Sequence, residues 1–232
     1  MKKVLTHATQ SLIILAAGLL VAMPVAADSV VKTTSDGTVG FKENSSSNIP
    51  VVNPEAPDEE IPSNTNGPLS LNYVSNIAFG KQELSTKQET YYADLDSSIF
   101  TKGVAPFVEM VDARGAGNSS ETAVTVTQVS QFKSGTNTLD GAALTFSMGR
   151  GVNAGGGKYI PKSTDKFTLV PGTAQLVMQT DGTVGQYLTS YGSAKDYQDT
   201  TKGSPISLTV PAGAAVKGDY TATLQWDLTT AP

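Results

Sequence analysis

The chain has 232 residues, a formal net charge of -5 at pH 7, one histidine and no cysteine. Catalytic sites built on a cysteine nucleophile and folds held together by disulfides are therefore excluded. An acidic chain with scattered lysines also lacks the clustered cations that neutralise phosphates, so no nucleic-acid partner is expected.

The first 27 residues predict a secretory signal peptide. Lys2 and Lys3 supply its positive charge, an apolar run covers residues 12–22, and small residues follow as far as Ala27. This run is about half of the ~20 residues that a membrane span needs, so we expect cleavage after Ala27 and no membrane span in the exported chain. His7 lies in the signal, so the exported chain has no histidine. Its net charge becomes -7, because 14 basic residues (16 - 2) face 21 acidic ones.

Two segments separate the signal from the main domain. Residues 28–43 alternate threonine, valine and phenylalanine after an Asp-Gly turn, and could form a single strand with nothing local to pair with. Residues 44–68 consist mainly of Asn, Ser, Pro, Asp and Glu. Prolines favour extended conformations and acids repel one another, so we expect a disordered, stretched linker that contributes nothing to a core.

Residues 69–232 predict an all-β domain, a β-sandwich of mainly antiparallel strands. Short runs that alternate apolar and polar residues are separated by glycine-containing turns. Residues 82–92 are the only run in this domain that is compatible with a helix. Residues 149–155 are glycine-rich but precede no helix, so they are interpreted as a flexible loop rather than a nucleotide-binding motif. The clearest strand-like runs cover residues 123–129, 143–148, 174–179, 206–210 and 220–228.

The exported part contains no recognisable catalytic constellation. A Ser-His-Asp triad and a zinc site of His and Cys ligands both need residues that are absent. Several acids could supply the two carboxylates that glycoside cleavage needs, but no sequence spacing identifies a catalytic pair. The simpler interpretation is that these acids are solvated surface residues. We expect no cofactor, no metal site and no enzymatic activity. The acids in question are Glu83, Glu89, Asp94, Asp96 and Glu109.

The last strand-like run places Leu224, Trp226 and Leu228 on one face and polar residues on the other. This pattern is typical of a half-buried strand, so Trp226 is expected to fill the sandwich core. The alternative is that Trp226 is exposed and stacks on a sugar.

Several motifs occur in order along the chain. Residues 67–80 open the domain after the Pro- and acid-rich segment, and residues 112–115 form an Asp-x-Arg-Gly stretch. Near the end, Tyr220 precedes a Leu-x-Trp-x-Leu pattern centred on Trp226. Together these motifs resemble the WxL-domain cell-surface proteins of low-GC Gram-positive bacteria. The first Trp-x-Leu motif of that family aligns with Thr122-Ala123-Val124, so its tryptophan is absent here.

The resemblance implies a secreted protein that attaches non-covalently to the cell wall and contributes to surface complexes or adhesion. Its implied partners are peptidoglycan or another wall polymer, other surface proteins of the same system, and host extracellular ligands. Non-covalent retention also fits a chain that ends at Pro232 without an apolar tail or sortase signal. Two alternatives stay open: a wall-active glycosidase, and a free secreted scaffold that binds only a protein. The candidate wall-binding or core residues are Tyr220, Leu224, Trp226, Leu228, Asp112 and Arg114.

Overall fold

The computed structural model describes residues 35–44, 49–63, 65, 67–115, 121–198 and 203–230. Residues up to Gly40 form one unit, and residues from Phe41 onward form another. The predicted signal peptide lies outside the described residues. Residues 35–44 contain no strand, and the earlier part of the segment 28–43, which could form one, lies outside the described residues.

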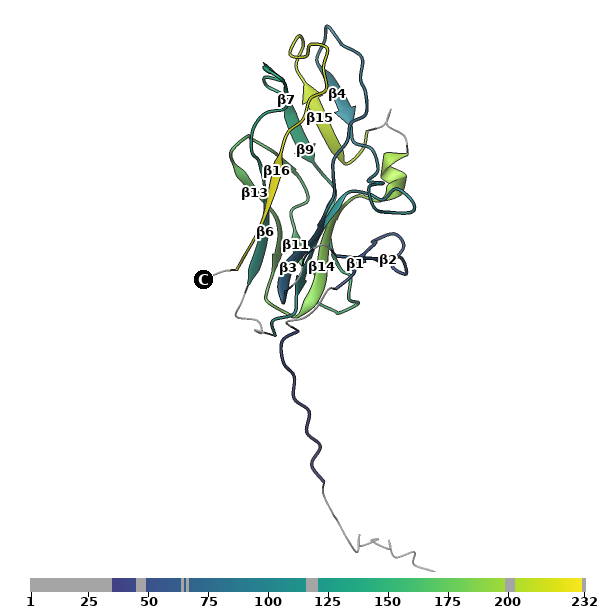
Figure 1. Cartoon of the computed structure of the whole chain (residues 1–232), viewed down its shortest axis with the longest axis vertical. Coiled ribbons are helices and arrows are strands. Elements are labelled where there is room, and N and C mark those ends of the chain that lie inside the picture. Colours follow the sequence, from purple (N-terminus) through teal and green to yellow (C-terminus); the bar gives the residue numbers. More distant parts are fainter. Residues whose placement is uncertain are drawn as a thin grey trace, which may run out of the picture. The chain divides into compact units, whose positions relative to one another are not determined.

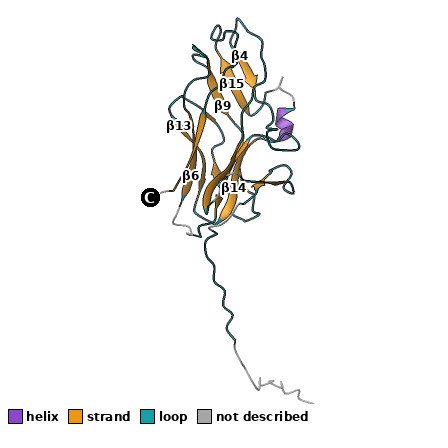
Figure 2. Cartoon of the chain, viewed as in Figure 1, coloured by secondary structure: helices purple, strands orange, loops and turns teal. Residues whose placement is uncertain are grey.

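The second unit is all-β, as predicted, and each described strand pairs antiparallel with its neighbours. In the described part of the chain, the helical structure is limited to the 3₁₀ turn η1 (Ala194–Tyr197), coloured purple in Figure 2, and no helix there could cross a membrane. Three four-stranded sheets form most of the domain. The first sheet has the strand order β10 (Gly149–Asn153), β14 (Gly185–Tyr191), β5 (Phe107–Asp112), β3 (Leu69–Val74). The second has the order β11 (Lys162–Ser163), β13 (Ala174–Thr180), β6 (Thr122–Gln128), β16 (Leu224–Thr230). The third has the order β12 (Phe167–Thr168), β9 (Ala143–Phe146), β15 (Ile206–Val210), β4 (Glu89–Tyr92). Two short hairpins, β1–β2 (Val51–Val52 and Glu60–Ile61) and β7–β8 (Lys133–Ser134 and Asn137–Thr138), complete the set.

The three large sheets share one hydrophobic core. Alternate residues of β6 enter it, so that Val124 and Val126 are fully buried. Met110 of β5 and Phe146 of β9 join the same cluster, and the Phe146 ring packs 4.9 Å from that of Tyr191. In Figure 1, β6, β13 and β16 face β3 and β14, while β9, β15 and β4 extend the domain at its other end. This layered arrangement confirms the predicted sandwich.

The glycine-rich stretch expected to be a loop is instead the edge strand β10, paired with β14 over its whole length. Its glycines are explained by close backbone approach. A Cβ on Gly149 would lie 2.2 Å from the carbonyl oxygen of Thr164, and one on Gly151 would lie 2.3 Å from that of Pro161. Only a residue without a side chain fits there. The run at residues 82–92 also forms no helix: its last four residues are strand β4.

Residues 49–63, which composition assigned to the stretched linker, are folded; we call them the strap. The strap carries the β1–β2 hairpin. Val51 and Ile61 are buried in a second cluster with Phe107 and Leu188, on the face of the β10–β14–β5–β3 sheet that points away from the main core. The composition argument failed because two well-placed apolar residues suffice to anchor a short segment, and because the acids of the strap bind backbone N–H groups instead of repelling one another.

Candidate functional site

The C-terminal motif lies on β16, next to β6. Trp226 pairs in register with Val126, and Leu228 with Val124. Leu224, Trp226 and Leu228 are partly buried and pack against the main core, while Gln225 on the other face is exposed. The alternation read from the sequence is therefore present, and the tryptophan packs on the edge of the core rather than at its centre.

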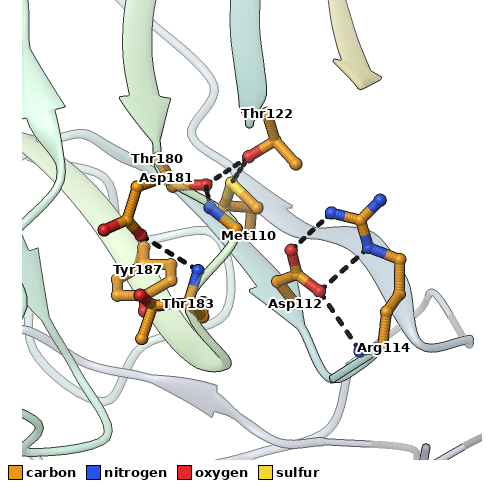
Figure 3. A network of polar contacts seen from close by, with 9 residues as sticks. Met110, Asp112, Arg114, Thr122, Thr180, Asp181, Thr183 and Tyr187 are labelled. Atoms are coloured by element: carbon orange, nitrogen blue, oxygen red, sulfur yellow. Dashed lines mark hydrogen bonds and ion pairs between the residues drawn. The ribbon is translucent and has the colours of Figure 1, made fainter. Parts of the chain in front are cut away.

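The residues that the resemblance aligned with a first Trp-x-Leu motif, Thr122-Ala123-Val124, begin the neighbouring strand β6. Thr122 is 1 % exposed and pairs in register with Thr230 of β16. Its hydroxyl lies 2.6 Å from that of Thr180 on β13 and donates to the sulfur of Met110 (3.7 Å), as Figure 3 shows. The space at this position is thus filled by two buried hydroxyls joined by one hydrogen bond, and the sulfur of Met110 accepts the second hydrogen.

Asp112 and Arg114 form an ion pair at the end of β5. The fully buried Asp112 carboxylate accepts hydrogen bonds from the Arg114 backbone N–H (3.2 Å), Nε (3.0 Å) and Nη2 (2.6 Å), a fork-like arrangement visible in Figure 3. These bonds raise the pKa of Arg114 further above its ordinary value. The Arg114 side chain is 18 % exposed, so its guanidinium is held in one orientation with part of its surface open to solvent.

A hollow of about 640 Å³ opens beside this pair. Ile49, Val111 and Val184 give it apolar surface, and Phe41, which is 93 % exposed, stands at its rim. Lys42 and Arg114 contribute cations, and Glu43 and Asp112 contribute acids. A surface that combines apolar side chains with oriented charges suits a polymer that has both sugar faces and ionised groups.

Tyr220 lies elsewhere. Its hydroxyl accepts from the Val216 backbone N–H (3.1 Å) and lies 3.3 Å from the Val216 carbonyl, and its ring packs on the core. The neighbouring Thr221 bridges to Lys133, at the end of β16 opposite to the one beside Thr122. The structure therefore brings Asp112 and Arg114 together but does not gather all six candidate residues into one site.

The carboxylates considered for glycoside cleavage occupy different environments. Glu83, Glu89 and Asp94 are exposed. Asp96 is buried and accepts a hydrogen bond from the Tyr73 hydroxyl (2.5 Å). Among the described residues, no group of three or more His, Cys, Asp or Glu side chains could hold a metal ion.

Glu109, the fifth of these acids, is not the solvated surface acid that the sequence suggested. Glu109 is fully buried in β5, with its carboxylate beneath the strap, and burial raises its pKa to about 7. The only signal in the sequence was an acid between Val108 and Met110 in an apolar run, which by itself does not separate a buried carboxylate from a surface one.

The family described as "WxL domain surface cell wall-binding" matches residues 28–232. No curated protein and no solved structure matches the chain.

Proposed function

This chain belongs to the WxL family of cell-wall-binding surface domains, and we propose that it is a secreted, non-enzymatic protein that holds to the wall non-covalently through the hollow beside Arg114. Attachment to the cell surface follows from the family. The choice of wall component and of the contact surface is our inference from the geometry.

The observation that carries the proposal is the Asp112–Arg114 fork at the hollow. Because the buried carboxylate fixes the guanidinium, no side-chain entropy is lost when an anion binds to it. Peptidoglycan combines sugar rings with the carboxylates of its peptide stems. The carboxylates would face Arg114 and Lys42, and the apolar faces of the sugars would pack on Phe41. Peptidoglycan is therefore the wall polymer that we propose as ligand.

The absence of histidine from the exported chain and the separate environments of the candidate acids favour binding over hydrolysis. Attachment to other surface proteins and a contribution to adhesion follow from the resemblance, and we include them in the proposal. A purified exported chain should leave the turbidity of washed walls unchanged, whereas a glycosidase would clear them.

Pelleting with washed wall sacculi tests the contact surface. Lys42→Glu places a negative charge at the hollow and should weaken binding about tenfold, since it removes a cation and adds an anion at an exposed site. Lys87→Glu is the matched control, because it makes the same change at an exposed residue beyond the hollow, just before β4. Phe41→Ala should also weaken binding without affecting stability. Equal binding by Lys42→Glu and Lys87→Glu would exclude the hollow as the contact.

A further inference from the structure

Glu109 sits in the middle of β5 with its side chain on the outer face of the sheet. Its neighbours in register are Tyr73 on β3 and Leu188 on β14. The strap covers this face, and Glu109 is 0 % exposed. A buried carboxylate without a cation is costly for a fold, so its surroundings decide which form of the group is tolerated.

The contacts of Glu109 within the described residues are all with neutral donors. The Val52 backbone N–H of the strap donates to Oε2 (3.0 Å), and the Gln186 amide of β14 donates to Oε1 (3.0 Å). Asn72 of β3 contributes a third hydrogen bond. Tyr73 donates its hydroxyl to Asp96 instead. Desolvation outweighs these bonds and raises the pKa of Glu109 to about 7.

The turn of the strap is held by carboxylates of its own. Glu59 accepts from the Thr101 backbone N–H (2.9 Å) and hydroxyl (2.6 Å), and these bonds lower its pKa. Glu55 accepts from the backbone N–H groups of Ala105 (3.2 Å) and Ala194. Asp58, the remaining acid of the strap turn with a described side chain, is exposed. The strap is therefore attached at two places through acids, one in the sheet beneath it and others in its own turn.

The two attachments respond to pH in opposite directions. Because the pKa of Glu109 is raised, the stabilisation that Glu109 gives to the closed strap is complete below the ordinary pKa of 4.5. This stabilisation is lost as the pH rises through about 7. The lowered pKa of Glu59 means that its contribution is present above 4.5 and is lost as pH falls below that value. Attachment is consequently strongest in mildly acidic solution.

We propose that the strap is a pH-operated cover: protonated Glu109 keeps it closed in mildly acidic surroundings, and ionised Glu109 lifts it at alkaline pH. Lifting hydrates the carboxylate and uncovers an apolar face that includes Phe107 and Leu188, with the Phe107 ring packed 5.0 Å from that of Tyr73. The remainder of the sandwich stays folded, because the strap cluster is separate from the main core.

Thiol labelling tests this proposal without relying on wall binding. The chain has no cysteine, so Val51→Cys introduces one reporter at a side chain that is 2 % exposed. Thr136→Cys, at an exposed turn residue between β7 and β8, is the reference that corrects for ionisation of the thiol. The ratio of the two labelling rates measures strap opening. Tryptophan fluorescence of Trp226, which packs on the main core, reports whether the domain itself unfolds.

Between pH 5.5 and 8 the relative labelling of Val51→Cys should rise on the order of 30-fold, the change expected when a pKa near 7 in the closed form becomes 4.5 in the open form. Adding Glu109→Gln should make the ratio nearly constant over this range, and Trp226 fluorescence should not change. Ile61→Cys, a second reporter in the same cluster, should follow Val51→Cys. A constant ratio with unchanged Glu109, or a rise that persists in Glu109→Gln, would overturn the proposal.

Discussion

Replacing Trp226 with alanine should destabilise the domain rather than remove a ligand contact. Most of the indole is covered, and it packs with Leu224 and Leu228 on the main core beside Val126. Replacing a fully buried tryptophan with alanine lowers the free energy of unfolding by about 3–5 kcal/mol. Because Trp226 is only partly buried, we expect a loss of about 3 kcal/mol in the free energy of unfolding, a large share of the ~5–15 kcal/mol that holds a domain together.

Urea unfolding followed by circular dichroism measures this loss, since Trp226→Ala removes the only tryptophan. Trp226→Phe should recover most of the stability. Leu84→Ala is the control, because Leu84 is 62 % exposed and its replacement should change the free energy of unfolding by less than ~0.5 kcal/mol. Binding to sacculi should fall in Trp226→Ala only as far as the domain unfolds. If the variant unfolded at the parental urea concentration but no longer bound sacculi, the tryptophan would be a ligand contact and this reasoning would be wrong.

Two further predictions concern buried groups, and a third concerns the close backbone approach at β10. The free energy of unfolding should fall by about 2–3 kcal/mol between pH 5 and pH 8 from Glu109 alone, because its raised pKa favours the folded state only while it is protonated; urea unfolding at each pH should show no such fall in Glu109→Gln. Thr122→Val and Thr180→Val should each lower the free energy of unfolding by about 1–2 kcal/mol, because each leaves a buried hydroxyl without its partner. The double variant should lose less than the sum of the two single losses. Additive losses in urea unfolding would show that the two hydroxyls are not coupled. Gly151→Ala should cost more than about 2 kcal/mol, whereas Gly155→Ala, whose added Cβ would meet its nearest neighbour at 3.5 Å, should cost about 0.5 kcal/mol; similar thermal midpoints would contradict the close approach at β10.

The sequence predicted those strands whose two faces differ. Residues 123–129 alternate because β6 has the core on one side only, and the run appears in the structure within one residue of its predicted bounds. Strand β5 went unrecognised because it is covered on both faces, by the core and by the strap, so every one of its residues is buried and no alternation remains. The glycines of β10 were misread for a different reason: the contact that requires them comes from residues 161–164, and a single sequence does not show which segments approach each other.

The candidate site was predictable only in part. Asp112 and Arg114 were singled out through the family motif, and their two-residue spacing allows the fork that the structure contains. The strap was missed because prolines favour an extended chain and neighbouring acids repel one another. The sequence does not show which backbone N–H groups lie opposite these acids in the folded protein. Thr101 and Ala105, which supply two of those donors, lie more than 40 residues away in the chain.

Strands β6 and β16 pair in register and both pack on the main core. Thr122 lies opposite Thr230 and Trp226 lies opposite Val126, so Thr122 and Trp226 face the same core from neighbouring strands. At the Thr122 position, the core is filled by the buried hydroxyl pair that this residue forms with Thr180 of β13. Leu224, Trp226 and Leu228 pack on the core, so the surface that we propose for contact with the wall lies outside them. The hollow beside Arg114, at the end of β5, provides such a surface.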